Sequence, residues 1–125
     1  MGEAVSEIQN AEADWVHIDV MDGVFVPNLT FGPKMVGDLR PYTDLPFDVH
    51  LMIEKPDQLI TAFAEAGADY ITFHLEAVVH AHRTVQLIRS LGKKPGVSIV
   101  PSISVSLLTE LLPFVDQVLI MTVNP

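Results

Sequence analysis

The chain has 125 residues, a formal net charge of −9 and no cysteine, and 49 % of its residues are apolar. This length fits a single domain, and the negative charge argues against a nucleic-acid partner because it offers no basic surface for phosphates. The lack of cysteine excludes disulfides and thiolate metal sites, while the lack of a long apolar run and of a signal peptide favours a cytoplasmic protein without a membrane span.

The first half of the chain alternates helical and strand patterns. A helix is predicted over Glu3–Ala13 and a strand over Trp15–Met21. A loop containing Gly and Pro covers residues 23–28 and leads to a short helix over Lys34–Arg40. The second predicted strand is Leu45–Met52.

The second half continues the same alternation. A helix over Gln58–Ala66 precedes the third strand, Asp69–Leu75, and a helix over His80–Leu91 precedes the fourth, Gly96–Val100. A last helix is predicted from Ser104 or Ser106 to about Leu112, followed by the fifth strand, Asp116–Val123. The last two strands are apolar nearly throughout, as expected when both faces of a parallel sheet are buried.

Four residues mark predicted helix ends. Pro33 suits the first turn of the helix that follows it, and Asp57 is a candidate N-cap. Gly67 and Gly92 stand directly after predicted helices, where a residue with positive φ is common.

Alternating strands and helices fit either an open doubly wound sheet or a closed barrel. No G-x-G-x-x-G or Walker-type loop follows any predicted strand, and polar residues sit toward the strand ends instead, where barrel enzymes keep their chemistry. A complete barrel takes about 250 residues, and five strands are visible here. We therefore expect an α/β fold, an incomplete TIM (β/α)8 barrel forming one domain over residues 1–125.

The segment His17-Ile18-Asp19-Val20-Met21-Asp22-Gly23 places polar groups on a strand that should be buried. Strand side chains alternate, so His17, Asp19 and Met21 share one face. An imidazole and a carboxylate two residues apart can reach one metal ion or one substrate. For this motif alone, a buried His–Asp pair that satisfies its own hydrogen bonds is an equally good interpretation.

A second predicted strand also carries polar residues, in Asp48-Val49-His50-Leu51-Met52, and this favours a shared site over a structural His–Asp pair. Neighbouring parallel strands lie about 4.8 Å apart, so His17, Asp19 and His50 can converge inside a barrel. Two imidazoles and a carboxylate suit Zn²⁺, Fe²⁺, Co²⁺ or Mn²⁺. On the same face, Met21 and Met52 are either core fillers or a cover that excludes water from the site.

Three other histidines are weaker candidates. His74 lies on the third predicted strand and is assigned either a supporting role or a substrate contact, with no preference between them. His80 and His82 fall at the start of a helix and are expected to be exposed and not to bind metal.

Several motifs in this order resemble the ribulose-phosphate 3-epimerase family, whose members are (β/α)8 barrels of the ribulose-phosphate-binding type. That family interconverts D-ribulose 5-phosphate and D-xylulose 5-phosphate in the pentose phosphate pathway, and a close relative acts on allulose 6-phosphate. The resemblance covers nearly the whole chain and rests on HIDVMDG (17–23), FVPN (25–28), FGP (31–33), DVHLM (48–52), FHLEA (73–77) and MTVNP (121–125).

The resemblance implies roles for six residue positions. His17, Asp19 and His50 would bind one divalent metal ion per subunit (Zn, Fe, Co or Mn), and Asp19 would also be one of two acid/base aspartates. The substrate-binding residues would be His50, Met21, Met52 and Met121. One departure is Val100-Pro101-Ser102-Ile103, where the family usually has a polar residue before the proline.

By the family's count, the chain runs from helix 1 through strand 6, without the first strand and strands 7 and 8. The second catalytic aspartate, which is also the fourth metal ligand, and the phosphate-binding loops belong to the missing parts. Epimerisation removes the proton at C3, passes through an enediolate and returns a proton on the opposite face. We therefore expect this chain alone to have little or no activity.

The expected partner is a small phosphorylated ketose, with no nucleic acid and no membrane, and a homo-oligomer is left open. Two alternatives remain at this point. One is an epimerase for a related ketohexose phosphate such as allulose 6-phosphate, and the other is a non-catalytic barrel fragment that packs with a partner.

Overall fold

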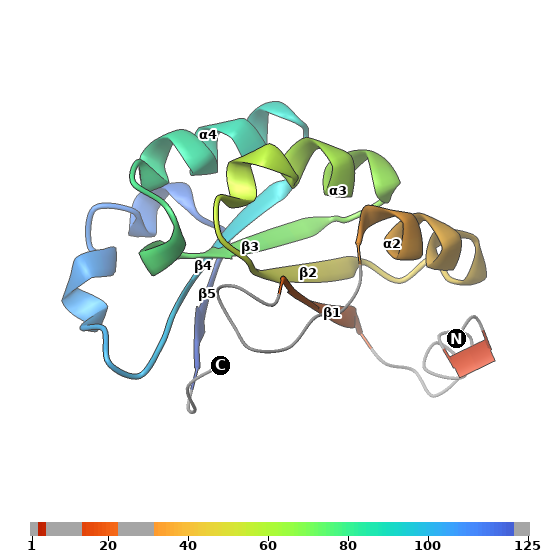
Figure 1. Cartoon of the computed structure of the whole chain (residues 1–125), viewed down its shortest axis with the longest axis horizontal. Helices are drawn as coiled ribbons and strands as arrows, with labels where there is room; N and C mark the ends of the chain where they lie inside the picture. The colour runs from red at the N-terminus through yellow and green to blue at the C-terminus, as the bar shows by residue number, and fades with distance from the viewer. Residues whose placement is uncertain (1–2, 5–13, 23–31, 122–125) are drawn as a thin grey trace.

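The computed structural model describes residues 3–4, 14–22 and 32–121, and within them it contains one five-stranded parallel sheet (Figure 1). The strands lie in chain order, which is the order that successive right-handed βα units produce. The predicted α/β fold with about five parallel strands is confirmed. The strands are β1 (Val16–Met21), β2 (Phe47–Met52), β3 (Tyr70–His74), β4 (Lys94–Ile99) and β5 (Gln117–Ile120).

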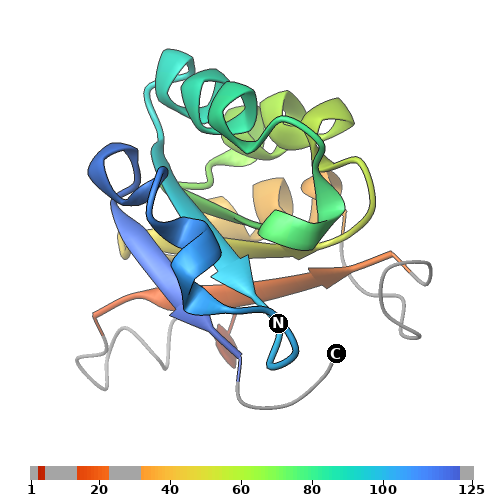
Figure 2. The ribbon, with the colours of Figure 1, turned by 90° about the vertical axis from the view of Figure 1, so that its left-hand side faces the viewer.

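Three α-helices cover one face of this sheet, as Figures 1 and 2 both show. Buried apolar side chains from this face and from the helices form a single core cluster, in which Phe47, Phe63 and Phe73 have no exposed surface. The α-helices are α2 (Pro33–Leu39), α3 (Ile60–Ala66) and α4 (Ala81–Ser90). Shorter 3₁₀ turns are η1 (Arg40–Tyr42), η2 (Pro56–Gln58), η3 (Leu75–Ala77), η4 (Val105–Leu108) and η5 (Leu112–Phe114).

Most predicted helix ends are confirmed. Pro33 is the first residue of α2, and Gly67 follows α3 with φ = 120°. A side chain at Gly67 would also collide with Arg40, because an added Cβ would lie 2.5 Å from the Arg40 Cδ. Gly92 follows α4 with φ = 78° and has open space around it. Gly67 is therefore required both by its backbone conformation and by close packing.

Two predictions about helices are wrong. Asp57 is not an N-cap, because α3 begins at Ile60 and Asp57 instead lies in η2, where its Oδ1 accepts a hydrogen bond from Thr84 Oγ1. The helix expected from Ser104 or Ser106 to Leu112 is replaced by the two 3₁₀ turns η4 and η5. Ser104 does cap η4, since its side chain accepts from the Ser106 amide.

The last strand is more exposed than its apolar sequence predicts. On β5, Val118 is 37 % exposed and Ile120 is 54 % exposed, so this strand is less covered than the strands beside it. The strand also ends at Ile120 rather than at Val123. The expectation that both of its faces are buried is therefore wrong for β5.

Three predicted segments lie wholly or mostly outside the residues that the structure describes. Most of the predicted helix over residues 3–13, the loop over 23–28 and the end of the MTVNP motif at 122–125 lie outside the described residues. None of the helices within the described part has the length and apolar character needed to cross a lipid bilayer.

The sheet face opposite the helices is polar. Residues that alternate with the core side chains point to it, among them Asp48 and His50 on β2 and Thr72 and His74 on β3. On β4 the corresponding position is Gly96, where an added Cβ would lie 2.3 Å from the Thr72 Oγ1. The side chains of Thr72 and Gln117 occupy this space, so a side chain at position 96 would displace them.

Candidate metal centre

The pairing of β1 with β2 brings two sequence motifs together. His17 lies opposite Asp48, Asp19 opposite His50, and Met21 opposite Met52. Because strand side chains alternate, all six project from the face that the helices leave uncovered. Asp19 and His50 are each two residues before the last residue of their strand, so the group lies within the strands rather than at their ends.

The three predicted ligands converge on one point. Asp19 Oδ1 lies 2.7 Å from His17 Nε2 and 3.1 Å from His50 Nδ1. One ligand atom from each of the three residues can be chosen so that all lie within 4.8 Å of one another. The side chains of His17 and Asp19 are 43 % and 46 % exposed, whereas that of His50 is 3 % exposed. The group is therefore open to solvent on one side and held by the sheet on the other.

Electrostatics in this group favour charged side chains. Hydrogen bonds to Asp19 and then to Asp48 raise the pKa of His17 to about 10, against the opposing effect of burial. Hydrogen bonds from His17 and His50 hold the pKa of Asp19 well below its usual range. Asp19 is therefore a carboxylate at neutral pH, and it faces two imidazoles.

These donors fit a divalent transition-metal ion. Zn²⁺ binds imidazole nitrogen and carboxylate oxygen at about 2.0–2.2 Å, so two donors on the same ion are separated by roughly 3–4 Å. The Asp19–His17 and Asp19–His50 contacts lie near that separation and need only small side-chain movements. Three protein ligands that are open to solvent on one side resemble a catalytic site, which keeps a further position for water or substrate.

Asp48 was not singled out as a functional residue from the sequence. Its Oδ2 accepts from His17 Nδ1 at 2.9 Å, so the other ring nitrogen of His17 faces Asp19. Gln117 on β5 donates to Asp48 Oδ1 at 2.8 Å and to Thr72 Oγ1 at 2.7 Å. A carboxylate behind a ligand histidine orients the ring and raises its basicity. The signal in the sequence was that Asp48 shares a face with His50.

His74 lies behind His50. The two Nε2 atoms are 2.8 Å apart and the rings stack with their centroids 4.8 Å apart. His74 Nδ1 lies 3.0 Å from Glu76 Oε1. His74 has no exposed surface, and its burial lowers its pKa. This contact with His50 favours the supporting role for His74 over a substrate contact.

The remaining predicted residues have distinct surroundings. Met21 and Met52 are paired across β1 and β2, and Met52 is buried. Met121 follows β5 and donates its amide to Ile99 of β4. His80 and His82 are exposed, as expected, and neither belongs to the three-residue group.

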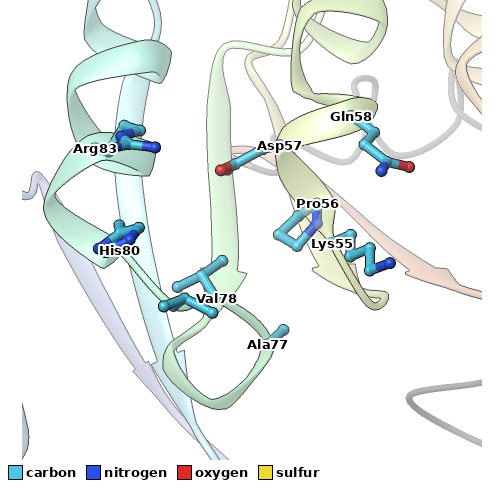
Figure 3. Close-up of a pocket in the computed structure, with 9 residues that line it drawn as sticks. Lys55, Pro56, Asp57, Gln58, Ala77, Val78, His80 and Arg83 are labelled. Carbon is cyan, nitrogen blue, oxygen red and sulfur yellow. The ribbon is translucent and has the colours of Figure 1, made fainter.

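A cavity of about 270 Å³ lies between the loops that follow β2 and β3 (Figure 3). In Figure 3, Arg83 on α4 and His80 just before α4 stand on one side of it, and Asp57 and Lys55 stand on the other. None of the three predicted metal ligands lines this cavity. The candidate centre is the open polar face of the sheet, and the cavity is separate from it.

Comparison with known proteins agrees with the motifs. The Ribulose-phosphate 3 epimerase family matches residues 1–125 of this chain. A ribulose-phosphate 3-epimerase of Treponema pallidum (strain Nichols) is 62 % identical over 113 residues, which are 90 % of this chain and 52 % of that protein. A ribulose-phosphate 3-epimerase of Bacillus subtilis (strain 168) is 52 % identical over 125 residues, which are 100 % of this chain and 58 % of that protein.

The similarity extends to a eukaryotic protein. A chloroplastic ribulose-5-phosphate-3-epimerase of Arabidopsis thaliana is 52 % identical over 127 residues, covering 100 % of this chain and 45 % of that protein. The chain thus spans about half the length of the curated relatives it matches. These names support neither the ketohexose-phosphate alternative nor the non-catalytic one.

Proposed function

The chain belongs to the ribulose-phosphate 3-epimerase family, and on that premise we propose that it forms part of an enzyme that interconverts D-ribulose 5-phosphate and D-xylulose 5-phosphate. The observation that carries the proposal is the convergence of His17, Asp19 and His50 on one face of the sheet. We assign His17, Asp19 and His50 as ligands of one divalent metal ion per subunit. The donor set suits Zn²⁺, Fe²⁺, Co²⁺ or Mn²⁺.

Asp19 is the residue to which we assign proton transfer. Its pKa lies well below the usual range, so it is ionised and can accept the proton from C3. A base with a low pKa removes such a proton only if the proton is made acidic. When bound, a divalent ion supplies that acidity by polarising the neighbouring C2 carbonyl and stabilising the negative charge that develops on oxygen.

Other residues on this face are assigned to positioning the ligands and to limiting the access of water. Asp48 keeps the His17 ring in position through the 2.9 Å contact with its Nδ1. Met21, Met52 and Met121 are assigned to the substrate site, where apolar side chains limit the access of water to the reacting carbon. His50 is assigned to both metal and substrate.

Inversion at C3 needs a second acid on the opposite face of the substrate. We assign that group, together with the loops that bind the substrate phosphate, to the part of the relatives' length that this chain does not match. We also propose a cytoplasmic location, which suits a sugar-phosphate substrate and a chain without cysteine.

A chimera tests the proposed function. Residues 1–125 replace their counterpart in the Bacillus subtilis relative, whose own sequence supplies the rest. We expect the chimera to epimerise ribulose 5-phosphate, and Asp19→Asn to abolish this activity while Glu110→Gln, an exposed charge change, leaves it intact. Allulose 6-phosphate tested in parallel should give no turnover. A chimera that unfolds cooperatively on heating, and is therefore folded, but shows no activity would contradict the proposal.

A further inference from the structure

The cavity between the loops that follow β2 and β3 has no part in the proposed function. Its volume is about 270 Å³, and Lys55 and Asp57 stand on one side of it and His80 and Arg83 on the other (Figure 3). We infer that it is a second binding site, which takes a small hydroxylated organic anion whose charged group is a phosphate or a carboxylate. This site does not depend on the proposed function, because none of the three assigned metal ligands lines the cavity.

Positive charge collects at this cavity although the chain as a whole is acidic. The chain has a net charge of −9 and seven lysine and arginine residues, all of them within the described part. Lys55 and Arg83 form no ion pair with any described carboxylate, whereas three other cations do, in the pairs Lys34–Asp38, Arg40–Asp69 and Arg89–Asp116. Two cations without a counter-charge on the described protein surface therefore remain available to an anion from solution.

Asp57 holds the two walls of the cavity in place. Its Oδ1 accepts a hydrogen bond of 2.7 Å from Oγ1 of Thr84, a residue of α4 that has no exposed surface, and this bond joins η2 to α4. In Figure 3 the Asp57 carboxylate and the Arg83 side chain point toward each other across the cavity, and they do not form an ion pair. A cavity that is held open before binding costs a ligand less free energy than one that must first form.

The wall formed by the start of α4 offers hydrogen-bond donors to a charged group. Arg83 carries a guanidinium with five N–H donors, and the ring of His80 has at least one N–H donor in either charge state. His80 is also the N-cap of this ten-residue helix, and neither a side-chain cap nor an acidic residue satisfies the first turn. The amides of that turn add to the attraction that the side chains provide. The phosphate or carboxylate of the ligand is therefore assigned to this wall.

The rest of the lining selects the rest of the ligand. Pro56, Ala77 and Val78 bring apolar surface to the cavity, which suits a carbon skeleton. The carboxylate of Asp57 accepts hydrogen bonds and repels a second negative charge, so a ligand hydroxyl is the group that fits beside it. The volume of about 270 Å³ lies just below the range of roughly 300–1,000 Å³ for pockets that take drug-sized ligands, and it suits a molecule of a few carbons.

Nuclear magnetic resonance of the ¹⁵N-labelled chain, at low salt and without added metal, tests the inference. Glycerol 3-phosphate and glycerate are titrated separately, so that a preference for phosphate or for carboxylate is measured directly. Inorganic phosphate carries only the charge, and glycerol carries only the hydroxyl groups. We expect saturable amide shifts within residues 55–58 and 77–83 for at least one organic anion, binding of inorganic phosphate that is about 2- to 10-fold weaker because one hydrogen bond is missing, and no binding of glycerol.

Arg83→Gln removes the cation that points into the cavity and keeps a polar side chain. We expect the affinity for the organic anion to fall about 10- to 100-fold, as for the loss of a hydrogen bond to a charged group. Lys34→Gln removes one positive charge from an exposed side chain of α2, away from the cavity, and should leave the affinity unchanged. Equal affinities of the wild-type and Arg83→Gln chains would overturn the inference.

The remaining outcomes separate this site from the proposed function. Shifts confined to β1 and β2 would place the anion at the candidate metal centre, which overturns the inference and agrees with the proposed function. Inorganic phosphate that binds as tightly as the organic anions, or the absence of shifts with every probe, also overturns the inference. A chain that binds an organic anion in the cavity but does not bind Zn²⁺ supports the inference and contradicts the proposed metal site.

Discussion

At the level of single residues, the candidate centre depends on Asp19. Its Oδ1 contacts both His17 and His50, and no other described carboxylate joins two histidines in this way. Each of these histidines also has a second partner, Asp48 for His17 and His74 for His50. The arrangement holds three potential ligands in place before any ion binds.

Replacing one ligand should remove metal binding. For His50→Ala, we expect the affinity for Zn²⁺ to fall by about 100-fold or more, because only two of the three ligands remain. Isothermal titration calorimetry measures this affinity. His82→Ala is the matched control, since His82 is exposed on α4 and contacts Gln86. Equal Zn²⁺ affinities for the two variants would show that His50 is not a ligand.

The charge of His17 predicts how metal binding depends on pH. Its two carboxylate partners raise its pKa to about 10, so the metal-free chain keeps His17 protonated at neutral pH. Zn²⁺ must displace that proton, because a cationic imidazole has no free lone pair. Apparent Zn²⁺ affinity should therefore rise with pH, by roughly tenfold per unit between pH 6.5 and 8. An affinity that stays constant over this interval would contradict the assignment of His17.

At the level of strands and helices, the sequence predicted the sheet well. Every strand is found near its predicted position, because period-2 alternation and glycine or proline at the ends are local signals. The same alternation placed His17, Asp19 and Met21 on one face, which is confirmed by the exposure pattern of β1.

The convergence of His17, Asp19 and His50 was predicted, but the exact register between the strands was not, because it is not a local signal. The register of β1 and β2 places Asp48 opposite His17 and His50 opposite Asp19, and only the folded sheet fixes that offset. For the same reason Gln117 was missed, since its partners Asp48 and Thr72 lie on β2 and β3. The last predicted helix is replaced by two 3₁₀ turns, in which Leu108 and Leu111 are buried while Val105, Leu107 and Leu112 are more than half exposed. A helix this short is marginal without a continuous buried face.

Arg40 illustrates how such a non-local contact stabilises the elements. It donates to the carbonyl oxygens of Thr43, Leu45 and Gly67 and forms an ion pair with Asp69. The Arg40 guanidinium also lies 3.8 Å from the centre of the Phe47 ring. One side chain thus connects the end of α2 to the starts of β2 and β3.

Loss of Arg40 should destabilise the fold. We expect Arg40→Ala to lower the free energy of unfolding, measured with urea, by about 2–4 kcal/mol because several carbonyl groups and Asp69 lose their partner. Arg40→Lys should recover little, since a lysine cannot reproduce the planar fork. Arg83→Ala, at an exposed position, is the control and should change stability by less than about 0.5 kcal/mol. A similar small change for Arg40→Ala would contradict this role.

At the level of the whole molecule, the sheet has two edges. β1 and β5 each pair with one strand among the described residues, and the outer face of β5 exposes Val118 and Ile120. The family's barrel would surround such a sheet with further βα units. The chain spans about half the length of its curated relatives, which agrees with a sheet of this extent.

The 125-residue chain by itself should not turn over ribulose 5-phosphate. We have assigned it three metal ligands and one acid/base group, Asp19, and inversion needs a second acid/base group. We expect no detectable product in an assay in which the intact Bacillus subtilis relative is easily measured. Turnover by the purified chain that disappears in Asp19→Asn would overturn this expectation.

The central claim is that one divalent ion binds between β1 and β2. Crystals of the chain grown with Zn²⁺ and measured at the zinc absorption edge locate the ion directly by anomalous scattering. We predict one strong peak at about 2.0–2.2 Å from His17 Nε2, an Asp19 carboxylate oxygen and His50 Nδ1. A peak elsewhere, such as at His80 or His82, with none between β1 and β2 would contradict the claim.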